Sequence, residues 1–200
     1  MADQGKQPRK QVSNFVRYKI KQLSESNKES AVKATLAKLR RGIGKMPGSM
    51  PELWDVTLNG LPETLQGKGD SPTQGEWAVY IALTFYALHQ QGKNIKNQCM
   101  CREKESLGVA VRKLVKSDED EKRIKRRFDT VVTSDSMEEL SHHLRGLIQL
   151  LKSENIALDY PALAEDLYRF QFSEARDSVR LKWGRDFYRI QNSEEKMIEQ

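Results

Sequence analysis

Three short stretches of the sequence carry residue types that could do chemistry. The segment 39–45, LRRGIGK, joins two arginines to glycines and a lysine, which are the components of a phosphate-binding loop. Cys99 and Cys101 offer thiols, and the adjacent His142 and His143 offer imidazoles. These stretches could serve nucleotide binding, redox chemistry or metal binding, provided that their spacing fits.

The glycine-rich stretch does not fit a nucleotide-binding P-loop. Such a loop has a glycine five residues before its Gly-Lys pair and a serine or threonine directly after it. Here Leu39 precedes Gly44 by five residues, and Met46 follows Lys45. A second Gly-Lys pair at positions 67 and 68 fails in the same way. The arginines therefore need another explanation.

The thiols and imidazoles do not form a metal site or a catalytic group. Cys99 and Cys101 are too close for an ordinary disulfide framework and lack the second Cys or His pair that zinc requires. His142 and His143 would point about 100° apart on a helix, so they cannot share a metal. His89 is expected at a helix C-terminus, where a partial positive charge is favoured. The sequence thus predicts no cofactor, no metal and no enzymatic activity.

Positive charge is concentrated in two parts of the chain. The net charge is +6, but residues 1–44 hold eleven Lys/Arg against three acids, whereas residues 135–200 hold nine against thirteen. A second basic cluster lies at 122–127. This distribution favours a polyanion bound on one face. Ordinary solvated helix faces are the alternative.

Helical periodicity dominates the chain and strand alternation is nearly absent. The pattern predicts an all-α bundle of about eight or nine helices. These helices form two possible sub-bundles, a basic N-terminal half at 1–116 and a C-terminal half at 117–200. The longest apolar run, 77–88, is shorter than a membrane span, and the N-terminus has no signal-peptide pattern. We therefore expect a cytoplasmic protein with a buried helix over this run.

Local signals place several helix ends. Gly42 is expected to end a helix in the left-handed conformation. Ser71 with Gln74 resembles a capping box at the start of the apolar helix. In the acidic run 118–121, Asp118 is predicted as the cap of a basic helix, with all four acids at the positive end of the helix dipole. That role explains the acids better than an interaction site.

Several short motifs follow one another along the chain: LRRG at 39–42, a Pro/Gly loop with Trp54, GKN at 92–94, SLG at 106–108, a basic helix, LRGLIQLLKS at 144–153 and LDYPALAEDL at 158–167. Their order resembles the CasB family, the small subunit of the type I-E CRISPR Cascade complex. Together the motifs cover about residues 30 to 190. Each motif is common alone, so the resemblance depends on their order.

The resemblance implies a non-enzymatic helical subunit of an RNA-guided complex. It implies two copies that contact the crRNA-bearing backbone subunits and the large subunit, and that hold target DNA and the displaced strand of the R-loop. The matching motifs carry over as nucleic-acid-binding residues Arg40, Arg41, Lys93, Lys122, Arg123, Arg126 and Arg127. Charge and loop position alone add Lys96, Arg102, Arg112 and Lys113.

Two other readings remain open. A free-standing helical DNA-binding regulator could use a helix-turn-helix around 116–118, although the acids at 118–121 would then face the DNA groove. A membrane-surface protein could dock through the basic amphipathic segment 10–23, although its apolar stripe is more simply a core face. Whether this N-terminal arm contacts nucleic acid or a neighbouring subunit also stays open.

Overall fold

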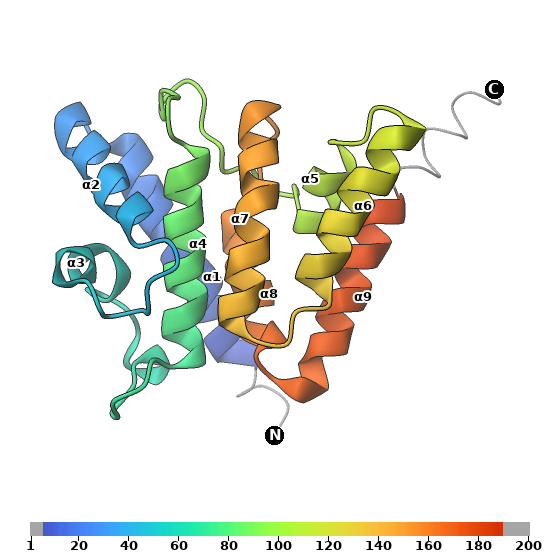
Figure 1. Cartoon of the computed structure of the whole chain (residues 1–200). Helices are drawn as coiled ribbons and strands as arrows, with labels where there is room; N and C mark the ends of the chain where they lie inside the picture. The colour runs from blue at the N-terminus through green and yellow to red at the C-terminus, as the bar shows by residue number, and fades with distance from the viewer. Residues whose placement is uncertain (1–5, 190–200) are drawn as a thin grey trace.

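The fold consists of helices joined by loops (Figure 1). The computed structural model describes residues 6–189, with side chains from residue 8 onward. Within this part the elements are α1 (Lys6–Glu25), α2 (Glu29–Arg41), η1 (Pro51–Leu53), α3 (Trp54–Thr57), η2 (Glu63–Leu65), α4 (Gln74–His89), α5 (Leu107–Arg112), α6 (Asp118–Val132), α7 (Met137–Ser153), α8 (Tyr160–Phe170) and α9 (Ser173–Arg189). The predicted all-α class is confirmed, and nine α-helices lie within residues 6–189.

Helix α4 is the centre of the fold. Every residue from Ala78 to His89 is buried. An apolar helix of this kind needs cover on all sides, and α4 contacts α1, α2, α7 and α8. These four helices therefore cover α4, and α6 and α9 lie farther out, against α7 and α8.

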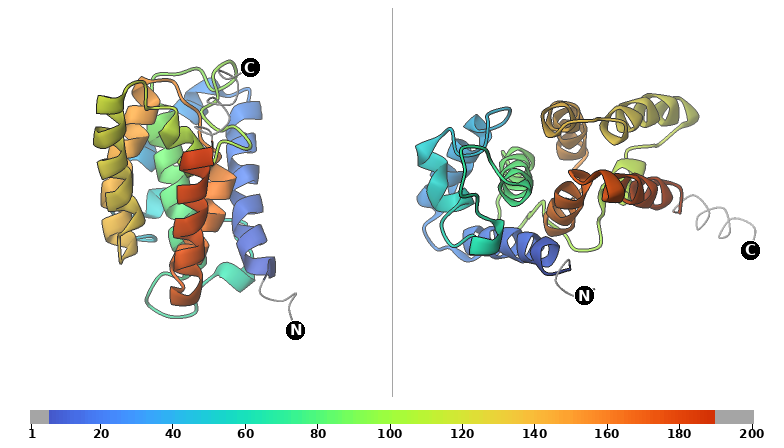
Figure 2. Two further views of the ribbon diagram at one scale, coloured as in Figure 1. Left: turned by 90° about the vertical axis from the view of Figure 1, so that its right-hand side faces the viewer. Right: turned by 90° about the horizontal axis from the view of Figure 1, so that it is seen from below.

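Six of the helices lie in two rows, which the right-hand view of Figure 2 shows end on. One row runs α4, α7, α6 and the other runs α1, α8, α9, with each helix contacting the next. Helices α4 and α8 connect the rows, and α5 packs on α9. Helices from before position 116 therefore pack against helices from after it. The predicted division of the chain into two halves at this position stays a prediction.

Helix α1 uses its apolar stripe to cover α8 and α4. Val12, Phe15, Val16 and Ile20 are all buried, and α1 contacts both helices. The interpretation of this stripe as a core face is confirmed, so it is not available to dock on lipid. None of the helices within residues 6–189 is long and apolar enough to span a membrane.

The end of α2 differs from the prediction. Gly42 is right-handed, with φ −74°, and the left-handed residue is Gly44, with φ +77°. Gly42 is needed for space, because a Cβ there would lie 2.7 Å from both Leu53 Cδ1 and Tyr80 Oη. The Tyr80 hydroxyl donates a hydrogen bond of 2.9 Å to the Gly42 carbonyl. This close approach seats the loop after α2 against α4.

The cap of α4 lies two residues beyond the predicted one. Thr73, not Ser71, accepts a hydrogen bond of 3.1 Å from the Glu76 amide, and the Glu76 carboxylate accepts one of 2.8 Å from the Thr73 amide. The sequence contains two overlapping capping-box patterns. The one that ends in a carboxylate interacts better with the positive end of the helix dipole than the one that ends in Gln74.

Candidate nucleic-acid interface

Helix α6 is capped by a serine and not by the predicted Asp118. Ser117 is the N-cap, and its hydroxyl accepts a hydrogen bond of 3.2 Å from the Asp120 amide. The predicted cap, Asp118, is instead the first helical residue. The four acids at 118–121 fill the first turn, where the positive end of the helix dipole stabilises them.

One side of α6 is apolar and the other is basic. Ile124, Phe128 and Val131 are buried against the core. The outer side, which we call the basic face, consists of four exposed cations that line one hollow together with Glu119 and Thr130; they are Lys122, Arg123, Arg126 and Arg127. The structure thus brings together all four residues predicted on this helix.

Most of the basic face has no internal partner. Arg123 binds Asp120 at 2.6 Å. Lys122, Arg126 and Arg127 form no ion pair or side-chain hydrogen bond within the part of the chain that the structure describes. Their charges are exposed and unneutralised, which suits an anionic partner such as a phosphate backbone.

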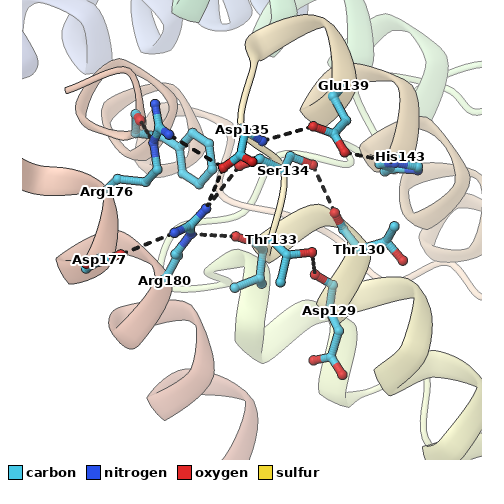
Figure 3. Close-up of polar contacts among 12 residues, drawn as sticks. Asp129, Thr130, Thr133, Ser134, Asp135, Glu139, His143, Arg176, Asp177 and Arg180 are labelled. Atoms are coloured by element: carbon cyan, nitrogen blue, oxygen red, sulfur yellow. Dashed lines mark hydrogen bonds and ion pairs between the residues drawn. The ribbon is translucent and has the colours of Figure 1, made fainter. Parts of the chain in front are cut away.

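Two arginines of α9 hold the C-terminal end of α6 (Figure 3). Arg180 donates from Nε to the Val132 carbonyl at 2.8 Å and from Nη2 to the Ser134 carbonyl at 3.1 Å. Asp135 Oδ1 lies 3.5 Å from Arg180 Nη2 and 3.8 Å from Arg176 Nη1. The last carbonyls of a helix have no partner inside the helix. Arg180 supplies one, and it thereby fixes the position of the basic face.

A second group of cations gathers where α2, α4 and α7 end. Burial lowers the pKa of Lys152, and the nearby charges of Arg40 and Lys93 lower it further. Lys152 Nζ donates to Gln91 Oε1 at 2.9 Å. Arg40 Nη1 lies 3.5 Å from the Ala87 carbonyl, and burial lowers the pKa of Arg40. Two of the predicted residues, Arg40 and Lys93, therefore lie in one cluster with Lys152.

Three further predicted residues, Lys96, Arg41 and Arg102, belong neither to the basic face nor to the cluster around Lys152. Lys96 donates from Nζ to Asn27 Oδ1 at 3.2 Å. Arg41 is exposed, with Nη2 3.6 Å from Glu52 Oε1. Arg102 is exposed and forms no side-chain hydrogen bond or ion pair among residues 6–189. All three are accessible to solvent and could meet a phosphate.

Arg112 and Lys113 each form an ion pair within the chain. The Arg112 side chain is 12% exposed, with Nη1 3.3 Å from Glu121 Oε1. Its guanidinium lies 5.5 Å from the centre of the Phe187 ring. Lys113 Nζ lies 2.6 Å from both carboxylate oxygens of Glu105. These contacts explain the two residues structurally, and their binding of nucleic acid stays a prediction.

Three cations that were not predicted as binding residues also lie at these surfaces. Lys152 completes the cluster of Arg40 and Lys93, and Lys45 and Arg145 line a pocket between α4 and α7. Lys45 could have been predicted from the sequence, since it is the last residue of LRRGIGK. Arg145 and Lys152 lie on the leucine-rich helix α7, and only the packing of that helix shows where they point.

The histidines and cysteines are accounted for by packing. Burial lowers the pKa of His89 to about 4, so the expected positive charge at this helix end is wrong and the ring is neutral. Burial raises the pKa of the Cys101 thiol to about 12. The rings of His142 and His143 contact each other edge-on, 5.2 Å between centres. No group of three His, Cys, Asp or Glu within residues 6–189 is placed to hold a metal ion.

Comparisons with known proteins agree on one family. A family model described as CRISPR-associated protein Cse2 matches residues 35–188. The crystal structure of CasB from Thermobifida fusca is similar, with a TM-score of 0.74, 32% sequence identity, and coverage of 89% of this chain and 98% of that chain. The fold of M. ruber CasB is also similar, with a TM-score of 0.67, 24% identity, and coverage of 94% and 97%. No curated protein sequence matches the chain.

Proposed function

The chain belongs to the family of CRISPR-associated Cse2 proteins, also called CasB, and we propose that it is the non-catalytic small subunit of an RNA-guided Cascade complex. The resemblance drawn from the order of its motifs is confirmed by the family match over residues 35–188. In this role the subunit binds nucleic-acid backbone and stabilises the DNA strand that is displaced when the R-loop forms.

The basic face of α6 is the observation that supports this proposal most directly. It presents four exposed cations on one side of a single helix, and three of them lack a partner within residues 6–189. Contacts of Lys and Arg to phosphates are largely independent of base sequence. A strand of any sequence can therefore lie along this face.

Such contacts suit the energetics of an R-loop. The RNA–DNA duplex that forms is about as stable as the DNA duplex that it replaces. A few kcal/mol from backbone contacts to the displaced strand are then enough to shift the balance. The subunit needs neither a catalytic group nor a cofactor for this task.

The partners that we propose are the crRNA-bearing backbone subunits, the large subunit, a second copy of this chain and the target DNA, all in the cytoplasm. The cluster of Arg40, Lys93 and Lys152 lies about half-buried at the ends of three helices. A half-buried cation is suited to a fixed partner, whether protein or RNA, and the exposed basic face is suited to a strand that arrives later.

Purification of an affinity-tagged chain from cells that carry its gene tests this function. We expect a set of larger proteins and a small RNA with repeat and spacer sequence to co-purify. A selection from random DNA tests the free-standing regulator at the same time. Recovery of the chain alone, together with strong enrichment of one DNA motif, contradicts the proposal and supports the regulator.

A further inference from the structure

A pocket of about 400 Å³ lies between the loop after α2, helix α4 and the first half of α7. One wall is formed by residues 43–45, the end of LRRGIGK, together with Met46. Trp77, Tyr80 and Ile81 of α4 contribute an apolar side. We call it the α4–α7 pocket. Its volume is within the range of small-molecule sites, and Figure 1 shows the loop passing beside α4.

The lining of the pocket includes two cations. Lys45 and Arg145 line it, and both side chains are exposed. Neither forms an ion pair or a side-chain hydrogen bond in the described part of the chain. Glu138, Ser141 and His142 of α7 add a carboxylate, a hydroxyl and an imidazole to the same lining.

This combination fits one nucleotide. A flat heterocycle packs against the indole and the other apolar groups, as bases do on aromatic residues of proteins that bind single strands. Lys45 and Arg145 then meet the attached phosphate. The Glu138 carboxylate can accept a hydrogen bond from the N3–H of thymine or from an exocyclic amine of another base, and Ser141 can donate to a ring nitrogen or a carbonyl. An acidic peptide would use the cations and leave the apolar side unfilled.

The pocket and the basic face of α6 lie on either side of α7. The Arg127 guanidinium lies 3.6 Å from where a Cβ on Gly146 would be, so it reaches over α7. The residue before Gly146 is Arg145, which lines the pocket. Neighbouring helices pack about 8–10 Å apart, and α6 contacts α7. A strand that follows the basic face can thus cross α7 and enter the pocket within a few nucleotides.

We propose that the α4–α7 pocket receives one unpaired base of a single-stranded nucleic acid whose backbone lies on the basic face. This inference rests on the proposed function. It adds a base-binding subsite to a surface that otherwise contacts only phosphates. A base held in this way is withdrawn from re-pairing with its complementary strand, so the pocket favours the open state of the duplex.

Trp77 is a built-in reporter of the bound base. The chain has three tryptophans; Trp183 is fully buried and Trp54 is 48% exposed. In a Trp54→Phe background, we expect a homothymidine DNA of about 12 nucleotides to quench Trp77 emission at about 50 mM salt. An abasic deoxyribose-phosphate oligomer of the same length binds about tenfold more weakly, the size of one stacked base.

Two variants on α7 separate the pocket from the rest of the surface. Ser141→Phe fills the pocket, and Gln149→Phe adds the same ring at an exposed position of the same helix. We expect Ser141→Phe to abolish both the quenching and the preference for the strand with bases, while its salt dependence stays that of the unmodified chain. Gln149→Phe keeps all three properties, and circular dichroism checks that both variants fold.

The outcomes distinguish this inference from the proposed function. Equal affinity for the two oligomers, or binding seen by anisotropy without any change in Trp77 emission, overturns the subsite and leaves backbone binding intact. Quenching by a hexaglutamate peptide but not by homothymidine overturns it in favour of an acidic protein segment. Failure of both oligomers to bind even at low salt contradicts the proposed function as well.

Discussion

The guanidinium of Arg180 in α9 donates a hydrogen bond of 2.8 Å to the carbonyl of Val132, the last residue of α6. A second bond of 3.1 Å goes to the carbonyl of Ser134, in the turn that follows. One side chain thus ties the helix that carries the basic face to the neighbouring helix of the other row (Figure 3).

Replacing Arg180 by alanine removes this tie. We expect Arg180→Ala to lower the free energy of unfolding by about 2 kcal/mol, because the loss of its charged donor groups leaves two half-buried carbonyls unpaired. Arg185→Ala, an exposed position on the same helix, should change it by less than about 0.5 kcal/mol. Urea unfolding of both variants measures the difference. Equal midpoints would show that Arg180 does not hold α6.

Gly108 in α5 is predicted to tolerate no side chain. A Cβ there would lie 2.2 Å from the Trp183 carbonyl and 2.9 Å from the Phe187 amide. Because both are main-chain atoms of a helix, they cannot move aside, and Gly108→Ala should cost about 3 kcal/mol or more. Gly184 has open space, so Gly184→Ala should stabilise α9 by about 0.5 to 1 kcal/mol. Thermal unfolding of the pair tests this, and a stable Gly108→Ala protein contradicts the close packing of α5 on α9.

The helix pattern could be predicted because burial repeats along the chain. The stripe of α1 and the all-round apolar α4 directly determine which faces are covered. Helix ends were less predictable, since several hydroxyls and carboxylates compete within a few residues. The cap of α4 is Thr73 and not Ser71, and the cap of α6 is Ser117 and not Asp118. The backbone before each helix places only one of the neighbouring side chains over the first turn.

The candidate site was predictable only where it lies on one helix. The basic face of α6 follows from 3.6-residue spacing alone. Lys152 and Arg145 could not be found in this way, because their neighbours come from α2, α4 and the loop after α2. Arg112 is the opposite case. Its charge predicts that it binds nucleic acid. Its contacts with Glu121 and Phe187 could not be predicted, because they depend on how α5 packs against α6 and α9.

The buried His89 makes stability depend on pH. The pKa of His89 is about 4 in the folded chain because of burial, against 6.5 for an exposed histidine. Between these values the unfolded chain binds more protons than the folded one. The contribution of His89 to the free energy of unfolding is therefore complete above pH 6.5. This contribution, about 3 kcal/mol, is lost as the pH falls to about 4.

Comparison with His89→Gln isolates this effect from the carboxylates that titrate in the same range. Urea unfolding from pH 7 to pH 4 should show a steeper loss of stability for the unmodified chain, by about 3 kcal/mol in total. Parallel curves for the two proteins would mean that the ring is protonated in the folded state.

The contacts of Arg112 favour a role in the fold over the nucleic-acid binding that its charge predicts, and one variant tests both roles. Arg112→Met keeps much of the aliphatic volume but leaves Glu121 without its partner and removes the cation from the Phe187 ring. We expect a loss of about 1 to 3 kcal/mol in the free energy of unfolding. The affinity for single-stranded DNA and its salt dependence should not change. A reduced salt dependence would instead place Arg112 among the phosphate contacts.

The basic face is predicted to supply the salt dependence of DNA binding. Each phosphate contact to a single strand contributes about 0.7 to the slope of log K against log salt concentration. Lys122 and Arg126 are exposed and lack partners within residues 6–189. The double variant Lys122→Ala with Arg126→Ala should therefore lower the slope by about 1.4. Lys38→Ala with Lys68→Ala removes the same net charge from exposed positions away from α6, so anisotropy titrations of the two variants between about 50 and 200 mM salt separate local contacts from overall charge. If both variants lower the slope equally, DNA responds to the net charge of the protein and α6 is not its binding surface.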